Sequence, residues 1–222
     1  MSSAGATRKY LCEVIGTYGL VFCGTGAIVI NEQTGGAIGH IGVAITFGAI
    51  VLAMIYAFGE VSGAHLNPVV TLGFLAAGRF PARQVVPYIG AQLIGAFLAS
   101  GTVKLLFPDN LGLGATIPAG PAMQSFVLEV ILTFFLMIVI LQVAHGSKEV
   151  GVLAGIAIGS TVLLEAMFAG PICGASMNPA RSLAPAVVSG NMGVVWIYLL
   201  APALGAVGAA FIWPLLRPVP RS

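Results

Sequence analysis

Long apolar runs with few charges alternate with short polar stretches along this chain. Six of the runs reach the length of about 20 residues that a helix needs to cross the hydrocarbon core of a bilayer. We place the predicted spans near residues 10–30, 38–59, 84–106, 123–144, 150–168 and 194–216. The pattern therefore predicts an all-α membrane protein with six transmembrane helices.

Two further apolar runs, 67–77 and 178–188, are too short to cross a bilayer. Each begins with Asn-Pro, in which the Asn side chain can cap free backbone N–H groups. Pro at the first helical position loses no hydrogen bond, because its missing donor has no helical partner there. A short apolar helix behind a polar cap predicts a re-entrant half-helix, which is tolerated where its irregular backbone faces protein or water.

The composition excludes a soluble protein. Charged residues make up 7% of the 222 residues and hydrophobic residues 58%, whereas soluble domains have about 25% charged residues. The net charge of +2 gives no sign of nucleic-acid binding. The length suits one membrane domain over 1–222. The three cysteines lack the spacing of a metal site and are interpreted as small apolar residues, so no cofactor or metal is expected.

The basic residues outside the spans set the expected orientation. Lys and Arg gather on the loops of one side, namely at Arg8, Lys9, Arg79, Arg83, Lys148, Arg217 and Arg221. By the positive-inside rule both termini are cytoplasmic, in a multi-pass protein of the cell (inner or plasma) membrane. The first run is too long for a signal peptide, and no convincing cleavage site follows it, so we interpret it as a retained helix.

The two halves of the chain, about 10–106 and 123–216, repeat one another. Each half holds three spans, and this odd number inserts the second copy upside down. Proteins with such inverted repeats carry their special sites near the midplane between the halves. The two half-helices are therefore expected to enter from opposite faces and to meet with their N-termini together.

Opposed helix N-termini create a positive potential, because each carries roughly half an elementary charge and free N–H donors. Asn67 and Asn178 can cap their own helices and direct amide N–H groups into a lumen. A water molecule there accepts from both, so that its hydrogens point away from the pair. This orientation discourages a proton-conducting chain, and the field opposes cations, as is recognised for aquaporin-type pores.

Four further polar residues lie close to these motifs. Arg181 follows the second motif, and an unpaired Arg at a bilayer centre costs at least about 2.5–3.5 kcal/mol. We expect loop carbonyls to hold it while its remaining N–H groups line the pore. Glu13 and Glu129 occupy equivalent positions, which favours acceptors for loop N–H groups over a proton relay. His65 is interpreted as a bonded pore-lining residue rather than a titrating gate.

These features together resemble the aquaporin family, also called major intrinsic proteins, over essentially the whole chain. The resemblance rests on the repeated Gly-Ala-x-x-Asn-Pro motif, the following Arg and the two span glutamates; its pore motifs are Asn67-Pro68-Val69 and Asn178-Pro179-Ala180. Residues 168–183 are most similar to the nodulin-26-like branch and its bacterial relatives, which include glycerol and metalloid-acid channels. The resemblance implies the inverted-repeat aquaporin fold in a lipid bilayer and a homotetramer with one pore per subunit.

The resemblance also implies a four-residue selectivity filter. Counted from the two motif asparagines, the family's filter positions fall on Phe47, Ala166, Ala175 and Arg181. Water-specific aquaporins typically have His where this chain has Ala166. The expected filter is wider and apolar on one side, which suits water with glycerol, urea, or neutral boric, silicic and arsenous acids.

Three positions depart from the family's pattern. Val69 replaces the usual Ala and is expected to shift half-helix packing without disturbing the Asn cap. Glu60 replaces a frequent His, and Glu165 stands where relatives often have Asn. Each Glu is open to three interpretations, a pH sensor, a proton site or a bonded polar residue, of which the last is favoured.

The leading hypothesis is a passive channel for water and small uncharged solutes. Its main rival is a proton- or ion-coupled secondary transporter, which Glu60 and Glu165 motivate. An enzyme is disfavoured, because no nucleophile and base arrangement emerges from the polar residues of the spans. Mercurials should block flux if the sulfur of Cys173 faces the lumen.

Overall fold

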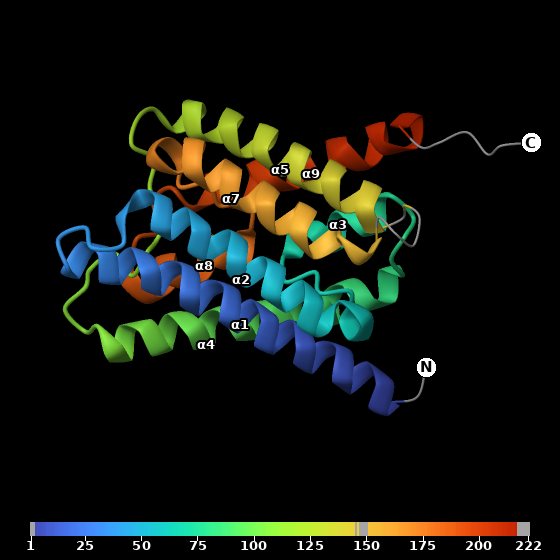
Figure 1. Cartoon of the computed structure of the whole chain (residues 1–222), viewed down its shortest axis with the longest axis horizontal. Helices are drawn as coiled ribbons and strands as arrows, with labels where there is room; N and C mark the ends of the chain where they lie inside the picture. The colour runs from blue at the N-terminus through green and yellow to red at the C-terminus, as the bar shows by residue number, and fades with distance from the viewer. Residues whose placement is uncertain (1–2, 145, 147–150, 217–222) are drawn as a thin grey trace, which may run out of the picture.

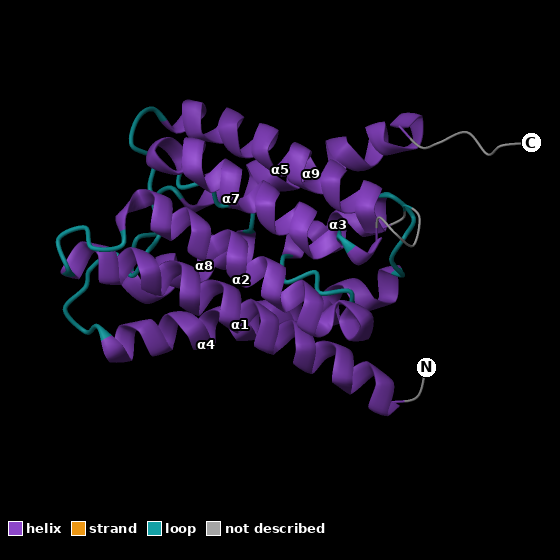
Figure 2. Cartoon of the chain, in the orientation of Figure 1, coloured by secondary structure: helices purple, strands orange, loops and turns teal. Residues whose placement is uncertain are grey.

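The computed structural model describes residues 3–144, 146 and 151–216, and these residues form helices and loops without a strand (Figure 2). Six helices are long and apolar enough to cross a membrane, which confirms the predicted fold class. They are α1 (Ser3–Gln33), α2 (Gly39–Ser62), α4 (Ala82–Leu106), α5 (Ala122–Ala144), α7 (Ala154–Cys173) and α9 (Val195–Leu216). Two short helices, α3 (Pro68–Ala76) and α8 (Pro179–Ser189), match the predicted half-helices.

The two ends of the described chain lie on one face of the helical bundle, which we call the terminal face (Figure 1). The loops between α1 and α2 and between α4 and α5 lie on the opposite face (Figure 1). Lys148, Arg217 and Arg221, which contribute to the expected orientation, lie outside the described residues.

Two predicted spans differ from their helices by several residues: α1 covers Ser3–Gln33 where 10–30 is predicted, and α7 begins and ends later than its span. The sequence predicts a span over 150–168, whereas α7 covers Ala154–Cys173 and continues through Pro171. Proline has no N–H for the carbonyl four residues earlier, which here belongs to Met167. That carbonyl oxygen instead lies 2.7 Å from Nε2 of His40 on α2, so the helix continues with its freed acceptor satisfied.

The contacts between helices recur in both halves of the chain. In the first half α1 packs against α2 and α4, and in the second half α5 packs against α7 and α9. The short helices cross over, so that α3 packs on α9 while α8 packs on α4. This exchange carries the N-terminus of each half-helix into the middle of the molecule, as an inverted repeat predicts.

Glycines allow the spanning helices to approach until their backbones touch. A Cβ at Gly95 on α4 would lie 2.2 Å from the carbonyl oxygen of Val14, and one at Gly205 on α9 would lie 2.3 Å from that of Val130. These two contacts occupy equivalent places in the two halves. Close packing through small residues is a main source of helix association in membranes, because lipid tails are as apolar as the side chains.

We expect Gly95→Ala and Gly205→Ala each to lower stability by about 1–3 kcal/mol, because the added methyl meets a backbone oxygen. The thermal aggregation midpoint in detergent measures this change. Gly101→Ala is the matched control on α4, since a Cβ there meets nothing within 4 Å. Its midpoint should stay the same or rise, because Ala favours a helix more than Gly does. Equal midpoints for Gly95→Ala and Gly101→Ala would contradict the close contact.

Candidate functional site

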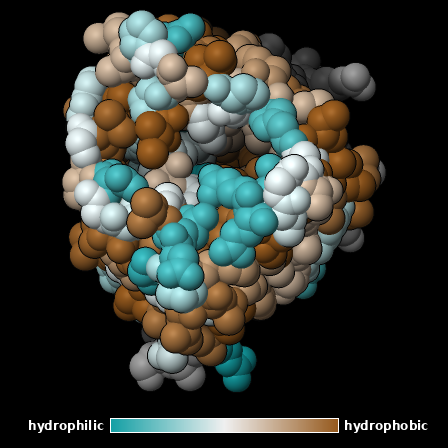
Figure 3. Space-filling view, turned by 90° about the vertical axis from the view of Figure 1, so that its left-hand side faces the viewer, coloured by the Kyte–Doolittle hydropathy of each residue, from teal (hydrophilic) through white to brown (hydrophobic). Residues whose placement is uncertain are grey.

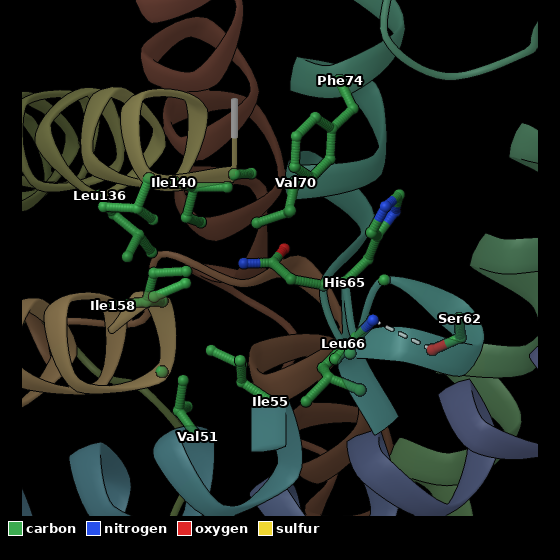
Figure 4. A pocket seen from close by; sticks show the side chains of 18 of the residues that line it. Val51, Ile55, Ser62, His65, Leu66, Val70, Phe74, Leu136, Ile140 and Ile158 are labelled. Carbon is green, nitrogen blue, oxygen red and sulfur yellow. Dashed lines mark hydrogen bonds between the residues drawn. The ribbon is translucent and has the colours of Figure 1, made fainter. Parts of the chain in front are cut away.

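A cavity of about 1120 Å³ connects the terminal face with the middle of the molecule. Its lining joins Lys9 and Arg83 to Asn67, Asn178 and Arg181. Apolar side chains form one wall, and Figure 4 shows them pointing inward from three helices: Val51, Ile55, Leu136, Ile140 and Ile158. The opposite face is hollowed at its centre, and hydrophilic residues gather around the hollow (Figure 3).

Both half-helices begin with a side-chain cap at the middle of the molecule. Oδ1 of Asn67 accepts from the backbone N–H of Val69 at 3.0 Å, and Pro68 is the first residue of α3. Oδ1 of Asn178 accepts from the N–H of Ala180 at 3.0 Å, and α8 likewise begins with its Pro179. Val69 thus leaves this cap bond in place, while Asn178 accepts in addition from the N–H of Arg181 at 3.3 Å.

Two further bonds tie the half-helix N-termini together. Nδ2 of Asn67 donates to the carbonyl oxygen of Met177 at 2.7 Å, and Nδ2 of Asn178 donates to that of Leu66 at 2.9 Å. An Asn amide has two N–H groups, so each Asn keeps one after this crossing bond. The prediction that both N–H groups of each Asn face a lumen is therefore wrong for the bonded group, and one group of each Asn remains for that role.

The loop before each half-helix has a strained backbone. Its φ angle is positive at Ala64 (45°) and Leu66 (52°) in the first loop, and at Ala175 (40°) and Met177 (51°) in the second. The left-handed conformation costs a residue with a Cβ roughly 1–2 kcal/mol. The strain therefore requires compensating contacts.

Two fully buried carboxylates supply these contacts. Glu13 accepts from the backbone N–H groups of His65 (2.9 Å) and Leu66 (2.8 Å). Glu129 accepts in the same way from Ser176 (2.7 Å) and Met177 (2.8 Å). Each carboxylate thus satisfies two N–H groups of an irregular loop, which is a structural role.

The surroundings of the two carboxylates differ. Glu13 also accepts from Oγ of Ser62 (2.8 Å) and Nε2 of Gln92 (2.9 Å). Gln92 donates in addition to Thr71 (3.0 Å), whose hydroxyl lies 2.9 Å from Nδ1 of His65. In the second half a bond between Ser176 and Ser182 stands in place of the His65–Thr71 bond. His65 is therefore a bonded residue that lines the cavity, as the sequence analysis favours.

Sequence reasoning missed one pair of anchors for the loops. The hydroxyl of Tyr88 donates to the carbonyl of Ser62 at 2.8 Å, and that of Tyr198 donates to the carbonyl of Cys173 at 2.7 Å. A signal for them was present, because Tyr-x-x-Ala-x-x-x-Gly-Ala occurs at both 88–96 and 198–206. The same motif contains the two close-contact glycines.

Arg181 is held from the loop between α4 and α5. Its Nη1 donates to the carbonyl oxygen of Gly114 at 2.8 Å, a partner that the sequence gives no means to identify. Its guanidinium carbon lies 5.0 Å from the centre of the Phe47 ring. Nε is buried and has no acceptor among the described residues. Arg181 is thus partly bonded to protein and keeps a free donor.

Three of the four expected filter residues line the cavity together, namely Phe47, Ala175 and Arg181. Ala166 is buried on α7 with 8% of its surface exposed and is not part of that lining. Phe47 packs flat against α1, because a Cβ at Gly24 would lie 2.1 Å from its ring. The positions are close in space, and their role in selectivity stays a prediction.

A family model described as "Major intrinsic protein" matches residues 1–213 of the chain. The chain belongs to the major intrinsic protein family. Members of this family, the aquaporins, are membrane channels and not enzymes. The capped N-termini of the two half-helices and the cavity beside them are thus parts of an aquaporin-family channel.

Curated relatives and a solved structure extend this assignment. The chain is 49% identical to Aquaporin NIP1-1 of Zea mays over 95% of its own length and 75% of the relative's. It is 48% identical to Nodulin-26 of Glycine max, with 95% and 78% covered. The X-ray structure of the aquaglyceroporin from Plasmodium falciparum superposes with a TM-score of 0.85 at 27% identity, covering 95% of this chain and 98% of that one.

The two unusual glutamates lie in different environments within the aquaporin-family channel. Glu60 is exposed and lines the cavity. Glu165 is buried on α7, next to Ala166, and its Oε2 has no donor among the described residues. The favoured interpretation of Glu165 as a bonded polar residue therefore does not hold for this oxygen.

We expect Glu129→Gln to reduce the yield of folded protein, because a Gln amide offers one acceptor oxygen where Glu129 offers two. One buried N–H of the second loop then lacks a partner, at a cost of about 1–3 kcal/mol. Glu60→Gln is the control, because Glu60 is exposed at the cavity wall. Size-exclusion chromatography in detergent measures the monodisperse fraction, and equal fractions for the two variants would contradict the role given to Glu129.

We expect no mercurial block through Cys173, because its side chain is fully buried and lies outside the cavity lining. Its Sγ accepts from the N–H of Ala175 at 3.4 Å. Flux before and after mercurial treatment should respond alike in the parent and in Cys173→Ser. Ala175→Cys places a thiol in the lining and is the positive control. A block in the parent that Cys173→Ser removes would show that the thiol reaches the lumen.

Proposed function

We propose that this aquaporin-family channel passes water together with small uncharged solutes, namely glycerol, urea or neutral boric, silicic and arsenous acids. The observation that carries the proposal is the pairing of Arg181 with the Phe47 ring beside small residues. Such a site combines hydrogen-bond donors, an apolar ring face and room left by two alanines. A solute with hydroxyls on one side and alkyl or bare surface on the other matches it.

Arg181 supplies the polar side of the proposed filter. One of its N–H groups is bonded to Gly114, and its Nε is left without an acceptor among the described residues. The buried Nε is closed to a solute, but a guanidinium has further Nη N–H groups. From the cavity lining these groups can donate to a solute oxygen, which compensates the solute for lost water. The ring of Phe47 gives the alkyl part of the same solute an apolar contact, and no polar side chain from Ala166 or Ala175 competes with it.

Ion exclusion in the proposal comes from three positive features. The N-termini of α3 and α8 each contribute roughly half an elementary charge, and Arg181 adds a full charge. The remaining N–H of Asn67 and of Asn178 turns a water oxygen toward the pair. Cations then meet a barrier, and a continuous proton chain is interrupted, as recognised for aquaporin-type pores.

The second candidate is a proton-coupled transporter. The buried Oε2 of Glu165, without a donor among the described residues, favours it. The names of the relatives favour the channel, since all those compared are called aquaporin, aquaglyceroporin or nodulin. We also propose that the protein forms a homotetramer in the cell membrane and that its termini are cytoplasmic. The basic residues Lys9, Arg79 and Arg83 at the cavity mouth support the orientation of the termini.

Stopped-flow measurements on proteoliposomes test the proposal with water, glycerol, urea and arsenous acid. A channel should give fast, gradient-driven flux with a low activation energy and no proton current. Ala166→His should reduce glycerol flux more than water flux, because the ring fills space and adds a donor. Arg181→Ala should admit protons or cations.

Two results would overturn parts of the proposal. Flux that requires a pH gradient, and loses that requirement in Glu165→Gln, would favour the transporter. An unchanged glycerol-to-water ratio in Ala166→His would remove Ala166 from the filter.

A further inference from the structure

One carbonyl group in the membrane helix α7 has no donor within its own helix. Pro171 has no N–H, so the carbonyl oxygen of Met167 cannot make its usual bond. A free carbonyl at the end of a membrane helix is stabilised when another group donates to it. Nε2 of His40 lies 2.7 Å from this oxygen and comes from a different helix, α2. A carbonyl only accepts hydrogen bonds, so Nε2 carries the proton.

The sequence of α7 also makes room for the imidazole ring. Gly170 lies one residue before the proline, and a Cβ there would be 2.9 Å from Cε1 of His40. Any other residue would push the ring away from the freed carbonyl. Gly170 and Pro171 thus prepare one partner, and His40 supplies the other.

The His40 bond is one of several contacts that set the separation of α2 from the α7 segment. The two helices touch at their middle, where a Cβ at Gly48 would lie 2.6 Å from the carbonyl oxygen of Gly159. Toward the terminal face, the hydroxyl of Tyr56 donates to the carbonyl of Val152 at 3.1 Å. The His40 bond is the corresponding contact at the other end. The separation of the two helices is therefore fixed at three levels.

The His40 contact adjoins Ala166, one of the two proposed filter positions on these helices, and the Gly48 contact adjoins the other, Phe47. Phe47 belongs to α2, and Ala166 belongs to α7 directly before Met167. The gap between these two filter positions therefore depends on how closely α7 is held to α2 at Met167.

We propose that His40 is a positioning residue for solute selectivity: by bonding the Met167 carbonyl that Pro171 leaves free, it fixes the width between Phe47 and Ala166. The inference rests on the proposed function, because it requires these two positions to form the filter. His40 itself need not touch the solute.

The test compares glycerol and water permeability in proteoliposomes for His40→Ala and His40→Gln. A typical hydrogen bond shifts a conformational equilibrium by roughly two- to tenfold, so the permeability ratio in His40→Ala should change at least about twofold. His40→Gln keeps an N–H donor and should restore the parent ratio at least in part. Tyr56→Phe removes the bond at the other end of the same helix pair and should leave the ratio unchanged.

A second background makes the test specific for the freed carbonyl. In Pro171→Ala the new N–H can bond Met167 within α7, so adding His40→Ala should have a smaller effect than it has in the parent. Full additivity of the two changes would overturn the inference, as would an unchanged ratio in His40→Ala. If His40→Ala does not fold, His40→Gln in the two backgrounds decides in the same way.

Ala166→His separates the two proposals. A changed ratio in Ala166→His with an unchanged ratio in His40→Ala rejects the positioning role and keeps the filter. An unchanged ratio in Ala166→His removes Ala166 from the filter, and with it the premise of the positioning role.

Discussion

The structure depends on one requirement, which is that the backbone N–H groups in the middle of the membrane have acceptors. A half-helix that begins at this depth exposes several such groups, and the loop before it exposes more. Glu13 and Glu129 each accept two of them, and Asn67 and Asn178 accept those of the first helical turns. Because these side chains accept the N–H groups, the N-terminal ends of the half-helices can face a cavity instead of protein.

The same bonds produce symmetry in the fold and asymmetry in the pore. The carboxylates, the crossing Asn bonds and the tyrosine anchors occur twice, and so the positive ends of α3 and α8 oppose one another. The side chains next to the loops differ, with His65 and Thr71 in the first half and Ser176 and Ser182 in the second. The Arg after the motif, Arg181, exists only in the second half, and the equivalent position of the first half is Val70.

Much of this architecture could be predicted from the sequence, because bilayer thickness and capping chemistry act locally. The six spans and both half-helices follow from length, polarity and the Asn-Pro signals. The extent of α7 could not be predicted in this way, because the carbonyl that Pro171 leaves free is bonded by His40, a residue distant in the sequence. The partner of Arg181 is likewise unpredictable, since a backbone carbonyl such as that of Gly114 has no sequence signature.

Selectivity can change in such a fold without changing the fold itself. The backbone at Ala175 and Arg181 is held by Glu129 and by the Asn178 cap, and neither contact involves the filter side chains. Ala166 and Phe47 stand on helices whose spacing is fixed by glycine contacts and carbonyl bonds elsewhere along α2 and α7. Under the proposed filter, a substitution at one of its positions alters pore chemistry directly, whereas a substitution at His40 alters it by moving the wall on which Phe47 and Ala166 stand.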